Sequence, residues 1–301
     1  MTAAPRTTTA PDVANGAKRA ANDAVENPWV VRFLRFGYVA RGLVYVVVGM
    51  LALRLSLGIR DVAMSQSGAL AVIGRQPFGH TMLVVVAVGL ASYALWQVIR
   101  AVADPNHEGG RSRSGIAKRL GFAASALGYI ALTVVTFRFI VGPRPSTATP
   151  YDPTAWVLEK PLGAWLAGIA GLAWMAIVAL QIVSTWRDFF DRNLDMDHRS
   201  RNERRWAQAL GRIGIATRGI LFFIIGILLV LSAFHANSQH LTGIDGALLG
   251  LARQPFGRTL LAAAGLGLVA FGAFSIMCAR WMRIGRAETA PRSQANPSSS
   301  V

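Results

Sequence analysis

Residues 75–79 read Arg-Gln-Pro-Phe-Gly, and residues 253–257 read the same five letters. Upstream of each copy lies a second recurring segment. Residues 37–45, Gly-Tyr-Val-Ala-Arg-Gly-Leu-Val-Tyr, return as Gly-Ile-Ala-Thr-Arg-Gly-Ile-Leu-Phe at residues 214–222. Two distant parts of the chain therefore carry the same pair of segments in the same order.

A third, weaker copy lies between these two. It reads Gly-Phe-Ala-Ala-Ser-Ala-Leu-Gly-Tyr at residues 121–129 and Glu-Lys-Pro-Leu-Gly at residues 159–163. The spacing from the first glycine of a unit to its proline is 40, 40 and 41 residues in the three units. Such regular spacing indicates three tandem repeats of one structural unit.

The composition is typical of a membrane protein. Of 301 residues, 53% are hydrophobic and 15% are charged, whereas soluble domains carry roughly 25% charged residues. Six apolar runs without Asp or Glu are long enough to cross a bilayer. They span about 36–57, 79–102, 120–142, 162–186, 212–235 and 258–282. Each unit holds two runs, which predicts an all-α fold with six transmembrane helices as three parallel two-helix repeats in a pseudo-threefold bundle.

The repeats set the expected domain boundaries. The expected parts are a disordered tail at 1–33, repeat 1 at 34–104, a linker at 105–118, repeat 2 at 119–188, a charged loop at 189–211, repeat 3 at 212–285 and a disordered tail at 286–301. The end of the charged loop, residues 204–210, is interpreted as a helix that lies on the membrane surface.

The charge distribution predicts the orientation. Lys and Arg gather in the N-terminal segment, in the loops after the second and fourth spans, and at the C-terminal end, and they are sparse in the other loops. By the positive-inside rule, both termini and these loops are expected to be cytoplasmic, in a bacterial plasma membrane. The net charge of +16 is then explained without nucleic-acid binding. The first span begins too late for a signal peptide, so the N-terminus is expected to stay uncleaved.

The glycine–aromatic–small–small–Arg–Gly segment followed by Gln-Pro-Phe-Gly, in three copies, resembles the bacterial membrane family called domain of unknown function 1206. The resemblance covers roughly residues 36–283. The middle copy departs from the pattern, because Ser125 replaces the arginine and Lys-Pro-Leu-Gly at 160–163 replaces Gln-Pro-Phe-Gly. The resemblance implies the fold and the topology, and it implies no activity.

Polar side chains inside the spans are the first candidate functional groups, because an ionisable residue in lipid is costly. Arg41 and Arg218 lie at matched positions, one to two turns inside the cytoplasmic edge of their spans. The polar residues at matched depth on the partner helices are Gln97, Gln181 and Ser275. Within the units, Arg41 is expected to bond Gln97, Ser125 to meet Gln181, and Arg218 to meet Ser275. Such pairs either orient the helices or line a polar cavity.

Two interpretations of Arg41 and Arg218 stay open. In the first, each arginine binds an anionic lipid headgroup or a substrate. In the second, each side chain snorkels toward the interface, where helix carbonyls or lipid phosphate accept its hydrogen bonds. Pro77 and Pro255 are read as the first residues of helices, where proline loses no hydrogen bond. Arg75 and Arg253 would then lie at helix N-termini, where the dipole disfavours a cation. That misfit makes them further candidates for anion binding. The alternative interpretation is that both are ordinary surface arginines.

Other recurring residues are interpreted as structural. Small residues that would let helices approach closely are Gly42, Gly49, Gly219, Gly226, Gly265, Gly267 and Gly272. Arg54 and Arg138 are expected to anchor the outer interface. Tryptophans near helix ends, expected in interfacial belts, are Trp96, Trp165, Trp186 and Trp281.

The missing motifs narrow the function. The five histidines have no metal-ligand spacing, and there is no phosphate-binding loop or nucleophile elbow, so no enzyme, cofactor or metal is expected. One open function is a non-enzymatic membrane protein whose basic cytoplasmic face organises or binds partners or anionic lipid. The alternative is a transporter or channel for a small or anionic solute, with a polar cavity on the pseudo-threefold axis lined by Arg41, Arg218, Gln97 and Gln181. Transport is favoured if the two arginines converge on that axis beside a wet cavity, and disfavoured if they face lipid phosphates.

Overall fold

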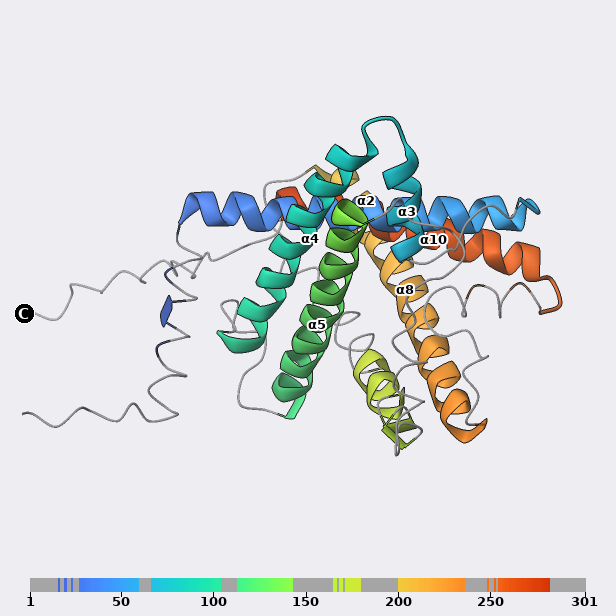
Figure 1. The fold of residues 1–301 in the computed structure, drawn as a ribbon. Helices are drawn as coiled ribbons and strands as arrows, with labels where there is room; N and C mark the ends of the chain where they lie inside the picture. Colours follow the sequence, from blue (N-terminus) through green and yellow to red (C-terminus); the bar gives the residue numbers. More distant parts are fainter. Residues whose placement is uncertain are drawn as a thin grey trace, which may run out of the picture.

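The computed structural model is helical throughout the residues that it describes (Figure 1). These are residues 27–59, 66–103, 113–142, 171–179, 200–235 and 254–281, with single positions at 16, 19, 20, 23, 165, 166, 168, 169, 248 and 252. The helices are α2 (Pro28–Ser56), α3 (Gln66–Arg75), α4 (Gly79–Val102), α5 (Arg113–Val141), α8 (Arg201–His235) and α10 (Gly257–Trp281). Residues 171–179 are helical as well.

Within this described part, five helices are long and apolar enough to cross a membrane. They are Pro28–Ser56, Gly79–Val102, Lys118–Val141, Arg201–Ile227 and Gly257–Trp281. The all-α fold and the membrane-like character of these helices are therefore confirmed. About half of the span expected at 162–186 lies outside the described residues, as do the C-terminal tail and most of the N-terminal tail.

Helix α2 begins before the apolar run, inside the segment expected to be a tail. The side chain of Asn27 accepts a hydrogen bond from the backbone nitrogen of Trp29 at 2.9 Å, which caps the first turn. Pro28 occupies the first helical position, where its missing N–H costs nothing.

Helix α8 also begins early, because a reciprocal capping box closes its first turn. The backbone nitrogen of Glu203 donates to Ser200 Oγ at 3.3 Å, and the backbone nitrogen of Ser200 donates to Glu203 Oε2 at 3.2 Å. From Arg201 the helix runs without a break to His235. Residues 204–210, expected to form a helix on the membrane surface, are helical and belong to the first turns of α8.

Helices α2 and α10 lie side by side and antiparallel, so close that glycines of both helices face each other (Figure 1). A Cβ atom at Gly42 would lie 2.6 Å from the carbonyl oxygen of Gly272, and one at Gly272 would lie 2.6 Å from that of Gly42. Two turns away, Gly49 and Gly265 make the same reciprocal contact at 2.6 and 2.8 Å. These glycines are packing residues as predicted, because no side chain fits between the backbones.

The hairpins of units 1 and 3 close through equivalent contacts. A Cβ atom at Gly37 of α2 would lie 2.5 Å from the backbone nitrogen of Tyr93 on α4, and one at Gly214 of α8 would lie 2.5 Å from that of Phe271 on α10. In the middle unit, the same position on α5, Gly121, faces Ile177 at 3.5 Å. The repeated sequence thus produces a repeated helix pair.

The Gln-Pro-Phe-Gly motif forms a tight turn, and its proline is not the first residue of a helix. The backbone nitrogen of Gly79 donates to the oxygen of Gln76 at 2.8 Å, and Phe78 adopts a left-handed conformation with φ of 63°. Because Pro77 has a negative φ, a positive φ at the next position makes this a type II turn, where glycine is the usual residue. Phe256 repeats the conformation with φ of 62°. The interpretation of the two prolines as helix starts is therefore wrong.

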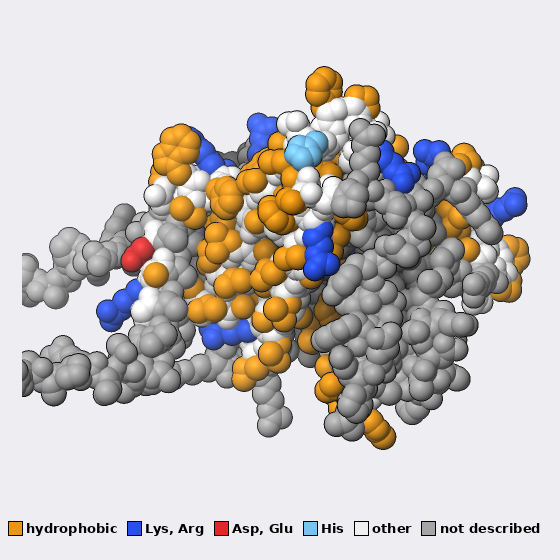
Figure 2. All heavy atoms as spheres, viewed as in Figure 1, with side chains coloured by type: hydrophobic (Ala, Val, Ile, Leu, Met, Phe, Trp, Pro, Cys, Tyr) orange, Lys and Arg blue, Asp and Glu red, His pale blue; other side chains and the backbone are white. Residues whose placement is uncertain are grey.

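Large hydrophobic side chains lie exposed on α4 and α5 (Figure 2). They include Val84, Val85, Val88, Leu95, Leu127, Ile130, Val134 and Phe137. An apolar surface of this extent is unusual on a soluble monomer and is suited to contact with lipid.

Replacing Gly42 by alanine should destabilise the protein, because its methyl group would meet the backbone of α10. Overpacking of this kind costs about 1–3 kcal/mol, so the melting temperature in detergent should fall. Gly128→Ala on α5 is the matched control, since nothing lies within 4 Å of its Cβ position. In a helix, alanine is also more favourable than glycine by about 1 kcal/mol. Equal losses in the two variants would contradict the close approach of α2 and α10.

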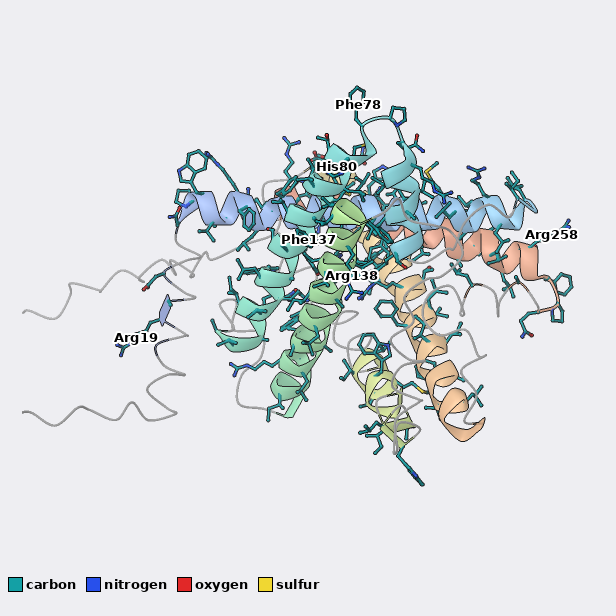
Figure 3. The ribbon with its side chains drawn as sticks, viewed as in Figure 1. Arg19, Phe78, His80, Phe137, Arg138 and Arg258 are labelled. Carbon is teal, nitrogen blue, oxygen red and sulfur yellow. The ribbon has the colours of Figure 1, made fainter. Side chains whose placement is uncertain are left out.

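Replacing Phe78 by glycine should stabilise the turn. The ring of Phe78 is 85% exposed and points away from the helices at the tip between α3 and α4 (Figure 3), so little packing is lost. Removing the strain of the left-handed conformation should raise the free energy of unfolding by about 1–2 kcal/mol. The greater freedom of glycine in the unfolded chain lowers this gain by about 0.4–1 kcal/mol. Thermal unfolding in detergent should show a gain for Phe78→Gly and none for Phe78→Ala, which keeps the backbone conflict. A gain in both variants would place the strain in the ring instead.

Candidate anion site among the arginines and tyrosines

Arg41 turns inward from the middle of α2. Its Nη1 donates a hydrogen bond to the hydroxyl of Tyr93 on α4. Its guanidinium carbon lies 4.7 Å from the centre of the Tyr93 ring and 4.6 Å from the centre of the Phe271 ring on α10. Arg41 therefore contacts two neighbouring helices, and stacking on aromatic rings partly compensates for its lost hydration.

Arg218 turns inward from α8 in the same manner. Its Nε donates to the hydroxyl of Tyr45 on α2 at 3.1 Å. Its guanidinium carbon lies 4.1 Å from the centre of the Phe222 ring on its own helix and 5.2 Å from that of Phe271. Arg218 thus reaches across to unit 1, as Arg41 reaches across to unit 3.

The two arginines converge, because both stack against Phe271. With both guanidinium carbons within 5.2 Å of one ring centre, they are no more than about 10 Å apart. Two unit charges at about 10 Å repel each other by about 1.7 kcal/mol at an effective dielectric constant of 20. An arginine stays protonated in a protein, so the repulsion is not relieved by loss of a proton.

Tyr129 brings a third hydroxyl into this region from the middle unit. Its ring packs edge-on against Tyr93 with 4.6 Å between the ring centres, as that of Tyr45 packs against Phe271 at 4.7 Å. Tyr129 is 6% exposed and lies within electrostatic reach of both arginines. Its hydroxyl has no hydrogen-bond partner among the described residues.

These five residues, Arg41, Arg218, Tyr45, Tyr93 and Tyr129, form what we call the arginine–tyrosine cluster. No Asp or Glu occurs in any of the six apolar runs to balance its two positive charges. The Nε of Arg41 is buried and lacks a partner among the described residues, as does the Tyr129 hydroxyl. The cluster is therefore rich in positive charge and in hydrogen-bond donors.

The expected polar pairs within the units are not the ones that form. Arg41 bonds Tyr93 and Arg218 bonds Tyr45, while Gln97 receives a 3.5 Å hydrogen bond from Arg100 Nη1, one turn along α4. Ser275 is fully buried, and its Oγ has no hydrogen-bond partner in the described part of the chain. The expected pairs of Arg41 with Gln97 and of Arg218 with Ser275 are thus wrong, because equal depth in sequence does not give the direction of a side chain around its helix. Gln181 lies outside the described residues.

Arg75 does not lie at a helix N-terminus. It is the last residue of α3, where the helix dipole favours a cation, so the misfit that suggested anion binding is absent. Its side chain is exposed. Arg253 lies outside the described residues.

The sequence interpretation missed the tyrosines of the cluster. A signal was present in the spacing. Tyr45 follows Arg41 by four residues, and Tyr129 follows the matched Ser125 by four. Residues four apart lie on the same face of a helix, so each tyrosine lies beside the matched position of its unit. Trp96 was expected in an interfacial belt, but its side chain does not lie on the outer surface of the helices. Its ring is fully buried, and its Nε1 donates to the Tyr38 hydroxyl at 2.8 Å.

The described residues contain no group of three His, Cys, Asp or Glu side chains that could hold a metal ion. Arg54 and Arg138, expected as outer anchors, are exposed. Both lie well away in sequence from the cluster on their own helices, which makes them useful controls.

Five described helices of membrane-spanning length and composition indicate that this molecule is a helical membrane protein. The chain belongs to the family described as Domain of Unknown Function (DUF1206), which matches residues 36–104, 120–188 and 213–282. Three tandem matches confirm both the family and the three copies expected from the sequence.

A relative in Bacillus subtilis strain 168, the uncharacterized protein YxxB, is 33% identical over 250 residues. The match covers 83% of this chain and 90% of the relative. No solved structure matches the chain.

Two isosteric substitutions in the cluster should have different effects on stability. Tyr93→Phe removes the acceptor of Arg41, and hydrogen bonds to charged groups are worth about 1.5–3 kcal/mol. Tyr129→Phe removes a buried hydroxyl without a partner, which should leave stability unchanged or raise it. Thermal unfolding of the ligand-free protein in detergent measures both. A large loss for Tyr129→Phe would mean that its hydroxyl has a partner in the folded protein.

Proposed function

We propose that this protein is a non-enzymatic transporter or channel for a small anionic solute, in a bacterial cytoplasmic membrane, with Arg41 and Arg218 on the path of the solute. The observation that carries the proposal is the convergence of both arginines on the Phe271 ring. An arginine in a spanning helix costs about 2.5–3.5 kcal/mol on insertion scales at the bilayer centre, and less near the interface. Two such residues, with no carboxylate in the spans, are suited to an anionic ligand that balances them.

The proposal includes six spans in three parallel hairpins around a pseudo-threefold axis. Its first support is the contact that recurs within the units. Equivalent residue pairs meet in all three, namely Gly37–Tyr93, Gly121–Ile177 and Gly214–Phe271. A span at 162–186 that pairs with α5 accounts for the middle contact.

Contacts between units give the second support. Gly49 of α2 faces Gly265 of α10, and at the equivalent position Gly226 of α8 faces the carbonyl oxygen of Gly171 at 3.3 Å. Helix α4, the second helix of unit 1, likewise packs against α5, the first helix of unit 2, through Tyr93 and Tyr129. The second helix of each unit thus meets the first helix of the next, and unit 3 meets unit 1, as a closed ring requires.

An even number of spans places both termini on one side, and the Arg-rich segments make that side cytoplasmic by the positive-inside rule. The second candidate function, binding of anionic lipid or protein partners at this face, is favoured by the exposed arginines Arg201, Arg204 and Arg205 at the start of α8. These residues lie far from the arginine–tyrosine cluster along α8, so the two functions can be tested separately.

Anion flux into proteoliposomes tests the proposal. Purified protein in zwitterionic lipid is assayed with a panel of chloride, nitrate, sulfate and phosphate. We expect flux of at least one anion above that of empty liposomes. Arg41→Gln with Arg218→Gln should lower this flux at least tenfold, because both compensating charges are lost.

The control for this experiment is the pair Arg54→Gln and Arg138→Gln, which removes the same total charge from exposed positions and should keep the flux. Equal losses in both double variants would remove the cluster from the path. Absence of flux for the whole panel, together with retention of anionic lipid that depends on Arg204 and Arg205, would support the second candidate instead.

A further inference from the structure

The donors left over in the arginine–tyrosine cluster define what it can hold. Arg218 uses its Nε for Tyr45, and its two Nη groups have no partner among the described residues. The hydroxyls of Tyr45 and Tyr93 accept from arginines, so each keeps its own proton to donate. The Tyr129 hydroxyl and the Arg41 Nε are buried, and neither has a hydrogen-bond partner within the described ranges. A ligand that accepts hydrogen bonds from several directions would satisfy these groups together.

The geometry of the guanidinium groups favours an oxyanion over a halide. Aromatic rings lie against both groups, with Phe271 near each and Phe222 at 4.1 Å from Arg218. A ring stacked on the face of a guanidinium leaves free the N–H groups at its planar edge. That edge matches two oxygens of a carboxylate or phosphate group, whereas a spherical ion uses one donor direction at a time.

The charge of the cluster favours a dianion. Arg41 and Arg218 contribute two positive charges, and the six apolar runs contain no acidic residue. A phosphate group with one ester bond, or free inorganic phosphate, carries between one and two negative charges near neutral pH and several strong acceptor oxygens. Its charge and its acceptors therefore correspond to the donors that the cluster leaves unused.

We propose that the arginine–tyrosine cluster binds a phosphate dianion, either free or as the headgroup of a phosphomonoester lipid, between Arg41 and Arg218 with the Tyr129 hydroxyl as an additional donor. The proposal rests on the proposed function, since it names the ligand of the same interior site. Tyr129 is a binding residue here, since its hydroxyl has no hydrogen-bond partner in the part of the chain that the structure describes.

Binding of inorganic phosphate, measured by calorimetric titration of the full chain in nanodiscs of zwitterionic lipid, tests this assignment. We expect saturable binding of phosphate. At the same ionic strength, sulfate should displace the bound phosphate at least tenfold more effectively than chloride or nitrate does. Arg41→Gln with Arg218→Gln should abolish phosphate binding. Arg41→Lys with Arg218→Lys keeps both charges but loses the planar fork, and should weaken binding about tenfold or more.

Tyr129→Phe is the sharpest variant, because its expected effects on stability and on binding diverge. It should leave the melting temperature of the ligand-free protein unchanged or higher, and weaken phosphate binding about tenfold. Arg54→Gln with Arg138→Gln should bind as the unaltered protein does. Equal binding by the unaltered protein and by Tyr129→Phe would remove the hydroxyl from the site.

A second set of nanodiscs that contain phosphatidic acid distinguishes the two sources of the phosphate. Competition by this lipid identifies the headgroup as the ligand, and the lack of competition identifies the free ion; both outcomes support the proposal. Equal binding of chloride and phosphate, or no phosphate binding at all, overturns it. If chloride or nitrate flux through liposomes still depends on Arg41 and Arg218 in that case, only the ligand class fails and the proposed function stands.

Discussion

The close approach of α2 and α10 at Gly42 and Gly272 is the contact on which the rest of the interior depends. Arg41 directly precedes Gly42, and Phe271 directly precedes Gly272. When the two backbones touch at the glycines, the arginine is brought over the phenylalanine ring. In a bilayer, where helices gain little from excluding lipid, such backbone contact is a main source of packing energy. One interhelical contact therefore both assembles the bundle and positions a charge.

This arrangement places stability and function in opposition. Packing at the glycines lowers the free energy of the bundle, whereas two unbalanced arginines among aromatic rings raise it. Stacking on Phe271 and the phenol hydroxyls offset only part of the loss of hydration, because neither supplies a negative charge. A residue that raises the free energy of the ligand-free fold, yet lies at matched positions in two repeats, is better explained by a ligand than by packing. The glycine contacts provide the stability that this requires.

The repeats, the family, the five described spans and the packing glycines could be predicted from sequence, because each depends on pattern or on residue size. The partners of Arg41 could not, since spans that are apolar on all faces do not reveal which side of the helix is buried. The start of α8 was predictable in principle from Ser200 and Glu203, whose spacing is that of a capping box. The apolar pattern concealed it, because the first turns of α8 are charged. The turn at Phe78 was not predictable, since a bulky residue rarely adopts a left-handed conformation.

The departures of the middle unit from the repeat pattern fit the proposed ligand. A third arginine at the matched position of the middle unit would add two further repulsive pairs, and the chain has Ser125 there instead. The tyrosine that follows it, Tyr129, is retained, so the middle unit contributes a neutral donor where the others contribute charges. Two charges with added phenol hydroxyls correspond to a dianion, whereas three would hold it more tightly and release it more slowly. A solute that must leave the site as well as enter it is served better by the two arginines and the serine.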